Sequence, residues 1–203
     1  CKIIGICGIC TIASDLGIIT SNYVANAMGL VSNSWEATEK STNKHLMREA
    51  FERCGDPSPR SIPVDGETDL SSLRLDYPII VKPTDRSGSR GIFKLEKPEG
   101  LEEAVKAALD AGFEKKALIE EFVEGVDISM VYVEGLGAMG PCEIDCNALF
   151  YDYEMKTVKD STVDITPAKG QYQDLKEIVM KIIKRLDIKG YAKLDFRIKN
   201  NEY

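Results

Sequence analysis

The chain has 203 residues, 43% of them hydrophobic and 29% charged, which is an ordinary composition for one large soluble domain or two small ones. The formal net charge of −7 argues against a general nucleic-acid surface or an anionic-membrane binder, so local Lys and Arg must hold any anionic ligand. No apolar run approaches the ~18 residues of a membrane span, and no signal peptide, repeat or low-complexity segment is evident. We therefore expect a cytoplasmic protein with no nucleic-acid or membrane partner.

The first quarter of the sequence predicts one strand and three helices. Lys2–Cys10 is an apolar run typical of a strand, and the segments after it carry apolar residues at helical spacing between capping residues. The expected helices are Asp15–Met28 closed by Gly29, a short helix from Asn33 or Ser34 through Glu39, and a longer one capped by Ser41 or Thr42 and ended by Gly55. Lys44 lies in the first turn of the longer helix, where a cation opposes the helix dipole. It is therefore either a solvated surface lysine or a group that reaches for an anion.

A hairpin follows the segment Asp56–Ser72, whose three prolines predict a linker between two lobes. Ile79–Val81 forms a buried strand that Lys82 ends, and Ile92–Leu95 resumes as a second strand. The loop between them, Thr84–Gly91, is rich in Gly and Ser and carries two arginines. Such a loop can lay backbone N–H groups and hydroxyls over a phosphate chain, with Lys82 as a fixed charge at its base, although a hairpin without a ligand fits these residues equally well.

The rest of the chain alternates strands and amphipathic helices. The last strand predicted, Gly190–Ile198, places Tyr191, Lys193, Asp195 and Arg197 on one face, which either lies in solvent or lines a charged cavity. The other expected elements are helices Pro98–Ala111 and Gln171–Asp187, strands Ala117–Phe122 and Ile128–Glu134, a long irregular loop Glu143–Ala168, and a hairpin turn at Asn200-Asn201.

Six cysteines leave a zinc or redox site open as an alternative. Cys7 and Cys10 form a C-x-x-C, and Cys142 and Cys146 form a C-x-x-x-C. Because the first pair lies in the expected strand, its side chains would point to opposite faces. We therefore interpret the cysteines as buried, inert thiols.

The motifs fall in an order that resembles the ATP-grasp superfamily of ligases. A lysine opens a helix at Thr42-Asn43-Lys44, a second lysine follows in I-V-K-P at 80–83, and a Gly/Ser loop covers 87–91. Glu-Glu-Phe-Val at 120–123 precedes Gly125 and Asp127, and G-x-x-x-x-D covers 190–195. Residues 150–156, FYDYEMK, resemble the substrate loop of D-alanine–D-alanine ligases, whereas residues 13–44 look more like the carbamoyl phosphate synthase and carboxylate–amine ligase branches.

The resemblance implies a role for each matching residue in holding ATP and Mg²⁺. Lys44 and Lys82 would contact phosphates, and Ser87, Gly88, Ser89 and Gly91 would fold over them as a lid. Glu120, with the backbone at Glu121 and Val123, would hold the adenine edge. Asp127 takes the ribose position, where glutamate is usual. Lys156 would meet the terminal phosphate, Asp195 would bind Mg²⁺, and Lys193 stands near the reacting phosphoryl group, where relatives often carry arginine.

The implied fold is the α+β (α/β) ATP-grasp fold, in which two lobes grip ATP, with a remnant of an N-terminal βαβ domain. We expect the remnant at residues 1–33, the first lobe at 34–121 and the second at 122–203. The implied enzyme phosphorylates a small-molecule carboxylate to an acyl phosphate and joins it to an amine, and analogy suggests a homodimer. The alternatives are a carbamoyl phosphate synthase-like enzyme that uses bicarbonate and a non-catalytic nucleotide-binding module.

The ends of the sequence depart from the superfamily pattern. The chain begins with Cys1 and ends at Tyr203, before the E-x-N pair of metal ligands that ATP-grasp enzymes carry. We therefore expect a fragment of a longer ligase, inactive by itself.

Overall fold

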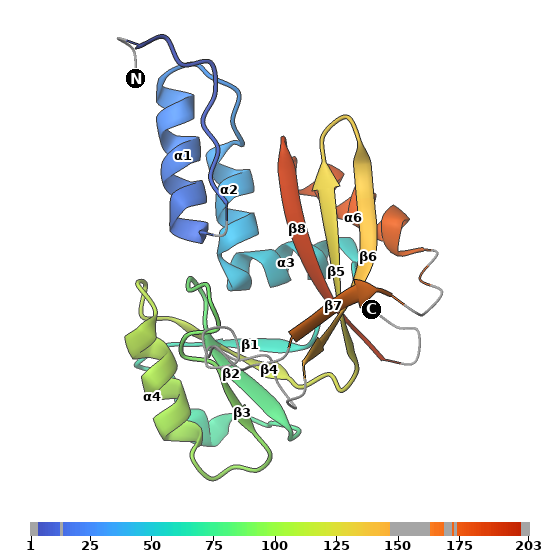
Figure 1. Ribbon diagram of the computed structural model, residues 1–203. Helices are drawn as coiled ribbons and strands as arrows, with labels where there is room; N and C mark the ends of the chain where they lie inside the picture. Colours follow the sequence, from blue (N-terminus) through green and yellow to red (C-terminus); the bar gives the residue numbers. More distant parts are fainter. Residues whose placement is uncertain (1–3, 13, 147–162, 169–171, 173, 200–203) are drawn as a thin grey trace.

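The strands that the structure describes form two four-stranded antiparallel sheets, and a helix covers one face of each (Figure 1). The computed structural model describes residues 4–12, 14–146, 163–168, 172 and 174–199. Its elements are α1 (Asp15–Ala27), α2 (Trp35–Thr42), α3 (Lys44–Cys54), β1 (Ser61–Val64), η2 (Leu70–Ser72), β2 (Ile79–Pro83), β3 (Phe93–Leu95), α4 (Leu101–Ala111), β4 (Ala117–Glu121), β5 (Val126–Val133), β6 (Gly137–Cys146), β7 (Val163–Pro167), α6 (Leu175–Arg185) and β8 (Tyr191–Ile198). None of the helices in these ranges is long and apolar enough to cross a membrane.

The first sheet, sheet A, has the strand order β1-β4-β2-β3. Ile79 and Val81 of β2 are buried in one core with Val105 of α4. Because side chains alternate along a strand, Lys82 projects from the other face, as does Glu120 of the neighbouring strand β4. Sheet A thus separates an apolar face under α4 from a face that carries charged groups.

The second sheet, sheet B, has the strand order β7-β6-β5-β8. Ile128 and Met130 of β5 are fully buried in a core with Val179 of α6. The alternate residue Ser129 lies on the opposite face, directly across from Asp195 of β8 in the antiparallel register. Sheet B therefore also has one apolar face and one polar face.

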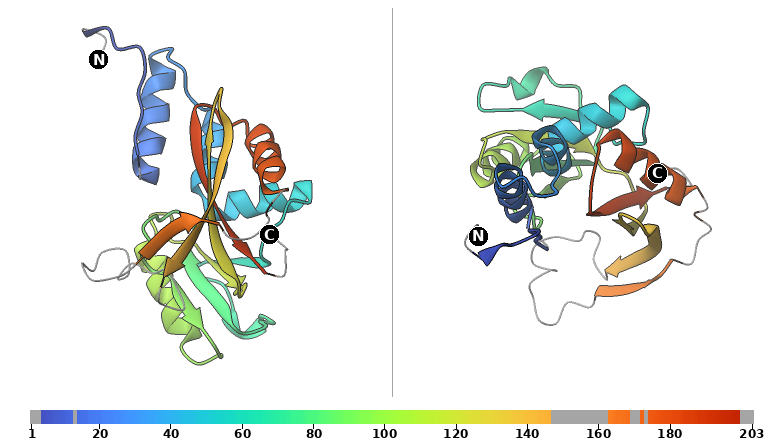
Figure 2. Two further views of the ribbon diagram at one scale, coloured as in Figure 1. Left: turned by 45° about the vertical axis from the view of Figure 1, so that its right-hand side comes forward. Right: turned by 90° about the horizontal axis from the view of Figure 1, so that it is seen from above.

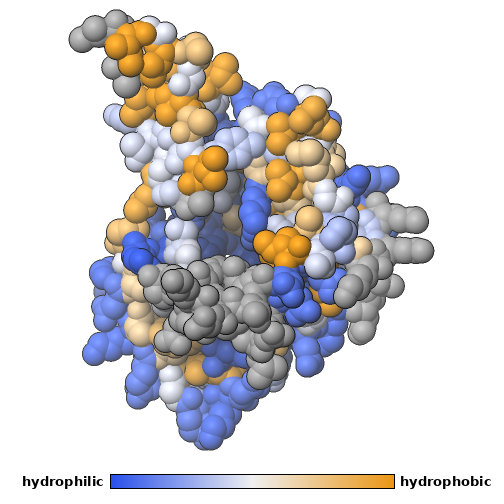
Figure 3. Space-filling view, viewed as in Figure 1, coloured by the Kyte–Doolittle hydropathy of each residue, from blue (hydrophilic) through white to orange (hydrophobic). Residues whose placement is uncertain are grey.

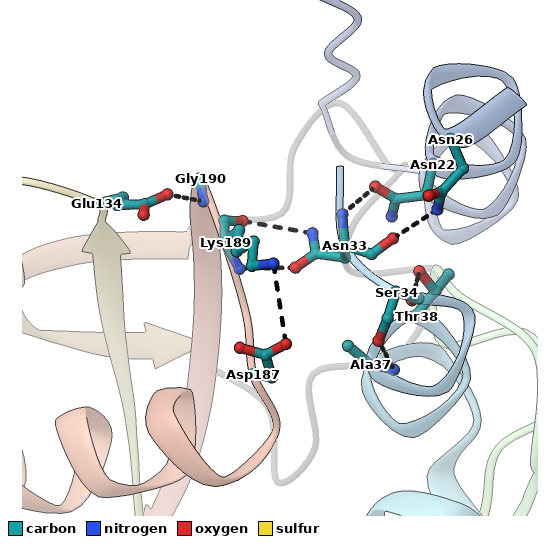
Figure 4. Close-up of polar contacts among 10 residues, drawn as sticks. All are labelled: Asn22, Asn26, Asn33, Ser34, Ala37, Thr38, Glu134, Asp187, Lys189 and Gly190. Atoms are coloured by element: carbon teal, nitrogen blue, oxygen red, sulfur yellow. Dashed lines mark hydrogen bonds and ion pairs between the residues drawn. The ribbon is translucent and has the colours of Figure 1, made fainter. Parts of the chain in front are cut away.

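Asn33, between α1 and α2, ties the N-terminal helices to sheet B (Figure 4). Its side-chain amide accepts a hydrogen bond from the backbone N–H of Lys189 at 2.6 Å and donates one to the Lys189 carbonyl at 3.3 Å. Two asparagines of α1 hold its backbone: Asn22 Oδ1 accepts from Asn33 N at 3.1 Å, and Asn26 Nδ2 donates to Asn33 O at 3.0 Å. This arrangement connects α1 to the turn before β8.

Helix α3 also lies beside sheet B, next to α6 (Figure 2). Leu46 and Phe51 of α3 line a cavity of about 270 Å³ together with Ile182 of α6. An ion pair between Asp56 and Arg185 links the residues that follow α3 to the end of α6. Helix α3 thus shares a cavity with α6, the helix that covers sheet B, although sheet A follows α3 in the sequence.

Most of the periodic elements are confirmed. The hairpin forms as antiparallel strands β2 and β3, and α1, α4 and α6 lie within the predicted helical segments. Gly29 and Gly55 follow α1 and α3 with φ of 71° and 65°, as the capping argument requires. The cap of α3 is neither Ser41 nor Thr42 but the next residue, Asn43, whose side chain accepts hydrogen bonds from the backbone N–H groups of His45 and Leu46.

The prediction of a strand at Lys2–Cys10 is wrong for the part of this segment that the structure describes. Residues 4–10 form a turn and irregular chain, and the side chain of Ile4 is 77% exposed. A strand needs a partner for its backbone groups, and none of the described strands pairs with this segment. Apolar side chains accordingly gather on the surface around the N-terminal segment and α1 (Figure 3), including Ile12 and Leu16.

Strands β1, β6 and β7 were not predicted, so the linker Asp56–Ser72 and the irregular loop Glu143–Ala168 are corrected in part. Strand β1 contains Pro63 and lies at the edge of sheet A, where proline is tolerated. Strand β6 contains glycines and Pro141, and its register against β5 shifts between Ser129 and Val131. Such an irregularity hides the period-two pattern. Residues 147–162 and the turn predicted at Asn200-Asn201 lie outside the described residues.

Candidate functional site

A buried ion triad occupies the charged face of sheet A. Glu120 Oε2 lies 2.5 Å from Lys82 Nζ, and Oε1 accepts a hydrogen bond from Arg48 Nε of α3 at 2.9 Å. The exposed fractions of the three side chains are 5% for Glu120, 13% for Lys82 and 21% for Arg48. Burial favours the neutral acid, but the charges of Lys82 and Arg48 outweigh it and hold the pKa of Glu120 below its usual value. Burial also lowers the pKa of Lys82, despite the opposing charge of Glu120.

Lys44, the first residue of α3, adds a further cation next to the triad. Its backbone N–H donates to the Thr84 carbonyl at 2.8 Å, and its Nζ donates to the Arg86 carbonyl at 2.6 Å. Burial, followed by the positive charge of Lys82, lowers the pKa of Lys44 to about 8. Lys82 and Arg48 thus bind the Glu120 carboxylate, and Lys44 lies near enough for its charge to interact with that of Lys82, so an anion bound here would relieve repulsion among the cations.

The loop at 87–91 begins beside Lys44, at an anchored base. Asp85 accepts hydrogen bonds from the backbone N–H groups of Phe113 and Glu114 at 3.0 and 2.8 Å, and the Arg86 guanidinium lies 4.5 Å from the centre of the Phe113 ring. Gly88, Ser89 and Gly91 all have φ between 58° and 72°. The backbone therefore adopts left-handed conformations that glycine tolerates best, and the loop rises from a fixed base.

Phe122 joins the two sheets at the link between β4 and β5. Lys94 Nζ of β3 lies 3.9 Å from the centre of its ring, and the Arg197 guanidinium of β8 lies 4.8 Å from the same centre. The ring therefore contacts one cation from each sheet, and such cation–π contacts are attractive. The neighbouring Glu121 side chain is bound by Arg60, whose Nε donates at 2.9 Å. The Glu121 backbone N–H donates to the Arg60 carbonyl at 3.0 Å, so any adenine contact at this residue would have to use its carbonyl oxygen.

The polar face of sheet B carries the candidate ribose and metal ligands. Arg197 Nε lies 3.5 Å from Asp127 Oδ1. Asp195 Oδ1 accepts a hydrogen bond from Ser129 Oγ at 2.9 Å and also contacts Lys193 Nζ. Lys193 and Asp195 thus share a face, as the strand alternation predicts.

Asp195 fits a magnesium ion that arrives with a phosphate ligand, but it does not form a complete metal site. Mg²⁺ commonly takes one or two protein carboxylates and fills its octahedron with water and phosphate oxygens. Ser129 fixes the Asp195 carboxylate, which suits such a ligand. In the described part of the chain, no group of three or more His, Cys, Asp or Glu side chains could hold a metal ion.

The structure brings Lys44, Lys82 and Glu120 together around the base of the loop, whereas Asp127, Lys193 and Asp195 lie on sheet B. Lys156 lies outside the described residues. The sequence reasoning did not find Arg48 or Ser129. The available signals were weak: Arg48 stands one helical turn after Lys44, and Ser129 faces Asp195 only once the strand register is known.

The interpretation of the cysteines as buried thiols is wrong for three of them. Cys7, Cys10 and Cys54 are exposed, and Cys142 is half-buried. The first pair is exposed because the strand expected to bury it does not form among residues 4–10. None of the described cysteines belongs to a group of three or more His, Cys, Asp or Glu side chains that could hold zinc.

A comparison with protein-family models shows the family to which the chain belongs. The family described as "D-ala D-ala ligase C-terminus" matches residues 67–203. The chain belongs to the D-ala D-ala ligase C-terminus family. Of the branches that the motifs resemble, it is the D-alanine–D-alanine ligase branch that this match supports.

Proteins named D-alanine--D-alanine ligase align with this chain over only part of their own length. A D-alanine--D-alanine ligase of Halothermothrix orenii is 34% identical over 134 residues, covering 63% of this chain and 38% of the relative. One of Geobacillus kaustophilus is 29% identical over 206 residues, covering 92% of this chain and 52% of the relative. The chain thus spans about half or less of the length of these two relatives.

Solved structures confirm the ATP-grasp fold expected for this family. The VanG D-Ala:D-Ser ligase of Enterococcus faecalis superposes with a TM-score of 0.76 at 18% identity, covering 89% of this chain and 56% of that one. An L-amino acid ligase of Bacillus licheniformis gives 0.75 at 18% identity, covering 96% and 46%. The D-alanine--D-alanine ligase of Bacillus anthracis complexed with ATP gives 0.72 at 16% identity, covering 90% and 60%.

Proposed function

We propose that this chain is the nucleotide-binding part of an ATP- and Mg²⁺-dependent ligase that joins an amino-acid carboxylate to an amine. The observation that carries the proposal is the excess of buried positive charge that Lys82 and Arg48 form around Glu120, with Lys44 near enough to interact with the charge of Lys82. A folded protein keeps such an excess at a cost to stability, and a phosphate chain would offset it. The family match favours an amino-acid carboxylate over bicarbonate.

The proposed reaction has two displacements. A carboxylate oxygen of the first substrate attacks the γ-phosphorus of ATP, and ADP leaves. The amine nitrogen of the second substrate then attacks the acyl carbon and loses a proton, inorganic phosphate leaves, and an amide bond remains. When bound, Mg²⁺ would supply charge neutralisation to the phosphates.

The chain's own residues would position the nucleotide and exclude water. Lys44 and Lys82 would hold phosphate oxygens, and the loop Ser87–Gly91 would cover them from its anchored base. The backbone at 121 and 123 would hold the adenine edge beside Glu120, whose two carboxylate oxygens are bound by Lys82 and Arg48, and Asp127 would accept ribose hydroxyls. Asp195, fixed by Ser129, would provide a carboxylate for Mg²⁺, and Lys193 would lie near the transferred phosphoryl group.

The lobes keep their proposed bounds, 34–121 and 122–203, after a remnant at 1–33. Helix α3 has contacts with both: Arg48 reaches Glu120 of sheet A, and Leu46 lines a cavity with α6. The homodimer and the cytoplasmic location stay predictions, and sedimentation of the purified chain would test the first.

A thermal melt with Mg²⁺·ADP tests nucleotide binding directly. Ligand at about 100 times its dissociation constant should stabilise the fold by about 2.7 kcal/mol, which raises Tm by roughly 5–10 °C for a chain of this length. Lys82→Ala should lose this rise, whereas Lys106→Ala, an exposed lysine on α4, should keep it. An unchanged Tm for the parent chain at millimolar ADP would contradict the proposal.

A further inference from the structure

Arg48 makes a contact that the sequence motifs did not predict and that phosphate binding by Lys82 does not require. It lies on α3 and reaches across to β4, where its Nε donates to Glu120 Oε1 at 2.9 Å. Lys82 takes the other oxygen, Oε2, at 2.5 Å. One carboxylate is therefore shared between two cations that come from different elements, with a separate oxygen for each.

The consequence for Lys82 follows from charge. A buried lysine that is the sole partner of a buried glutamate is held tightly by it, because both charges have lost their water. That attraction opposes any movement of the ammonium toward another anion. Arg48 places a second positive charge on the same carboxylate, and guanidinium stays charged at all working pH values. The group of three then carries a net positive charge, and Glu120 attracts Lys82 less strongly.

Arg48 also fixes where the carboxylate points. The Nε–H of arginine lies in a rigid plane, so its hydrogen bond sets the orientation of Oε1. With Oε1 bound, the carboxylate meets Lys82 through Oε2 alone. An ammonium group has three protons, and one contact leaves the others to be donated elsewhere.

We propose that Arg48 is a positioning residue for nucleotide binding: by holding Glu120 and sharing its charge, it keeps Lys82 available to the phosphates. This inference rests on the proposed nucleotide function and concerns the phosphate-dependent share of the affinity. A purely structural role, in which Arg48 only ties α3 to sheet A, would weaken every ligand of the site alike.

The test compares ADP with adenosine, which lacks phosphate, on the parent chain and its variants by calorimetric titration with Mg²⁺ present. Arg48→Met keeps the length of the side chain and removes its charge. It should weaken ADP binding about tenfold or more, the loss of one charge-assisted interaction, and adenosine binding less than about twofold. Arg48→Lys should recover most of the ADP affinity. The control Arg53→Met removes an exposed arginine from the same helix and should change neither affinity.

A double variant separates the two roles further. Arg48 is proposed to weaken the attraction between the Glu120 carboxylate and the Lys82 ammonium. Adding Glu120→Gln to Arg48→Met removes the negative charge that causes this attraction. The ratio of ADP affinity to adenosine affinity should then return toward the parent value. Equal weakening of both ligands by Arg48→Met, an unchanged ADP affinity, or a ratio that Glu120→Gln leaves low would each overturn the inference alone. A parent chain that binds neither ligand would overturn the proposed function, and the role of Arg48 with it.

Discussion

Removing the buried charge of Lys44 should stabilise the protein at neutral pH. Its pKa falls from the usual 10.5 to about 8, chiefly through burial, and about 1.36 kcal/mol per pKa unit makes this a cost of about 3 kcal/mol for the charged form. Lys44→Met also loses the hydrogen bond to the Arg86 carbonyl, worth about 1 kcal/mol. The variant should therefore gain about 2 kcal/mol in unfolding free energy at pH 7.

The pH dependence of the unfolding free energy provides a second test of the direction of this effect. Between pH 8 and 10.5 the folded state of the parent binds fewer protons at Lys44 than the unfolded state does. Its stability therefore rises with pH across this window, and the penalty is complete below pH 8. The advantage of Lys44→Met should accordingly be greatest at pH 7 and disappear by about pH 10.

Urea unfolding followed by circular dichroism at pH 7 and pH 10 measures both effects. Groups remote from Lys44 titrate alike in the two proteins, so the difference between them reports Lys44 together with Lys82, whose charge interacts with it, provided that the m-values agree. Lys106→Met, at an exposed position on α4, should show no such pH-dependent difference. A variant that is less stable than the parent at pH 7, or an advantage that does not change with pH, would refute the reasoning.

Three further changes have expected outcomes. Asn33→Ala removes both hydrogen bonds to Lys189 and should lower the unfolding free energy by about 1–3 kcal/mol; a loss under about 0.5 kcal/mol in urea unfolding would show that water replaces them. Gly91→Ala would place a Cβ 2.6 Å from a side chain of α4 at positive φ, whereas Gly88→Ala meets open space at a similar φ. Scanning calorimetry should therefore find a clearly lower Tm for Gly91→Ala than for Gly88→Ala, and equal Tm values would contradict this. Phe122→Leu loses two cation–π contacts and should cost about 1–2 kcal/mol, measured by urea unfolding and contradicted by an unchanged midpoint.

The sequence predicts those elements whose packing leaves a local periodic trace. Helix α6 buries Leu175, Val179 and Ile183, which recur at helical spacing. Strand β2 begins with the apolar run Ile79–Val81 and lies between two neighbouring strands. Strand β1 leaves no such trace, because it is short, lies at an edge and contains Pro63. The N-terminal run shows the opposite case, since apolar residues alone do not make a strand without a partner.

The candidate site divides in the same way. The residue pattern already raised Lys44 and Lys82 as possible anion contacts, and the resemblance implied that the anion is phosphate. Their proximity appears in the electrostatic effect of Lys82 on the pKa of Lys44. Arg48 was not found, because its role depends on the crossing of α3 over sheet A, which no spacing in the sequence records. Ser129 likewise becomes meaningful only when the register of β5 and β8 places it opposite Asp195.

Contacts between the N-terminal helices and the C-terminal part of the chain, such as that of Asn33 with Lys189 across 156 residues, can form only late in synthesis. Sheet A and α4 draw all their strand partners from residues 61–121, so this unit can fold on the ribosome as soon as it has emerged. Helix α3 is made earlier, but α6, which lies beside its apolar face, is completed only at Arg185. At about 5–20 residues per second the apolar face of α3 waits on the order of ten seconds for α6. During that interval Leu46 and Phe51 lack the residue of α6 that lines the cavity with them, so α3 completes its packing only after α6 has been made.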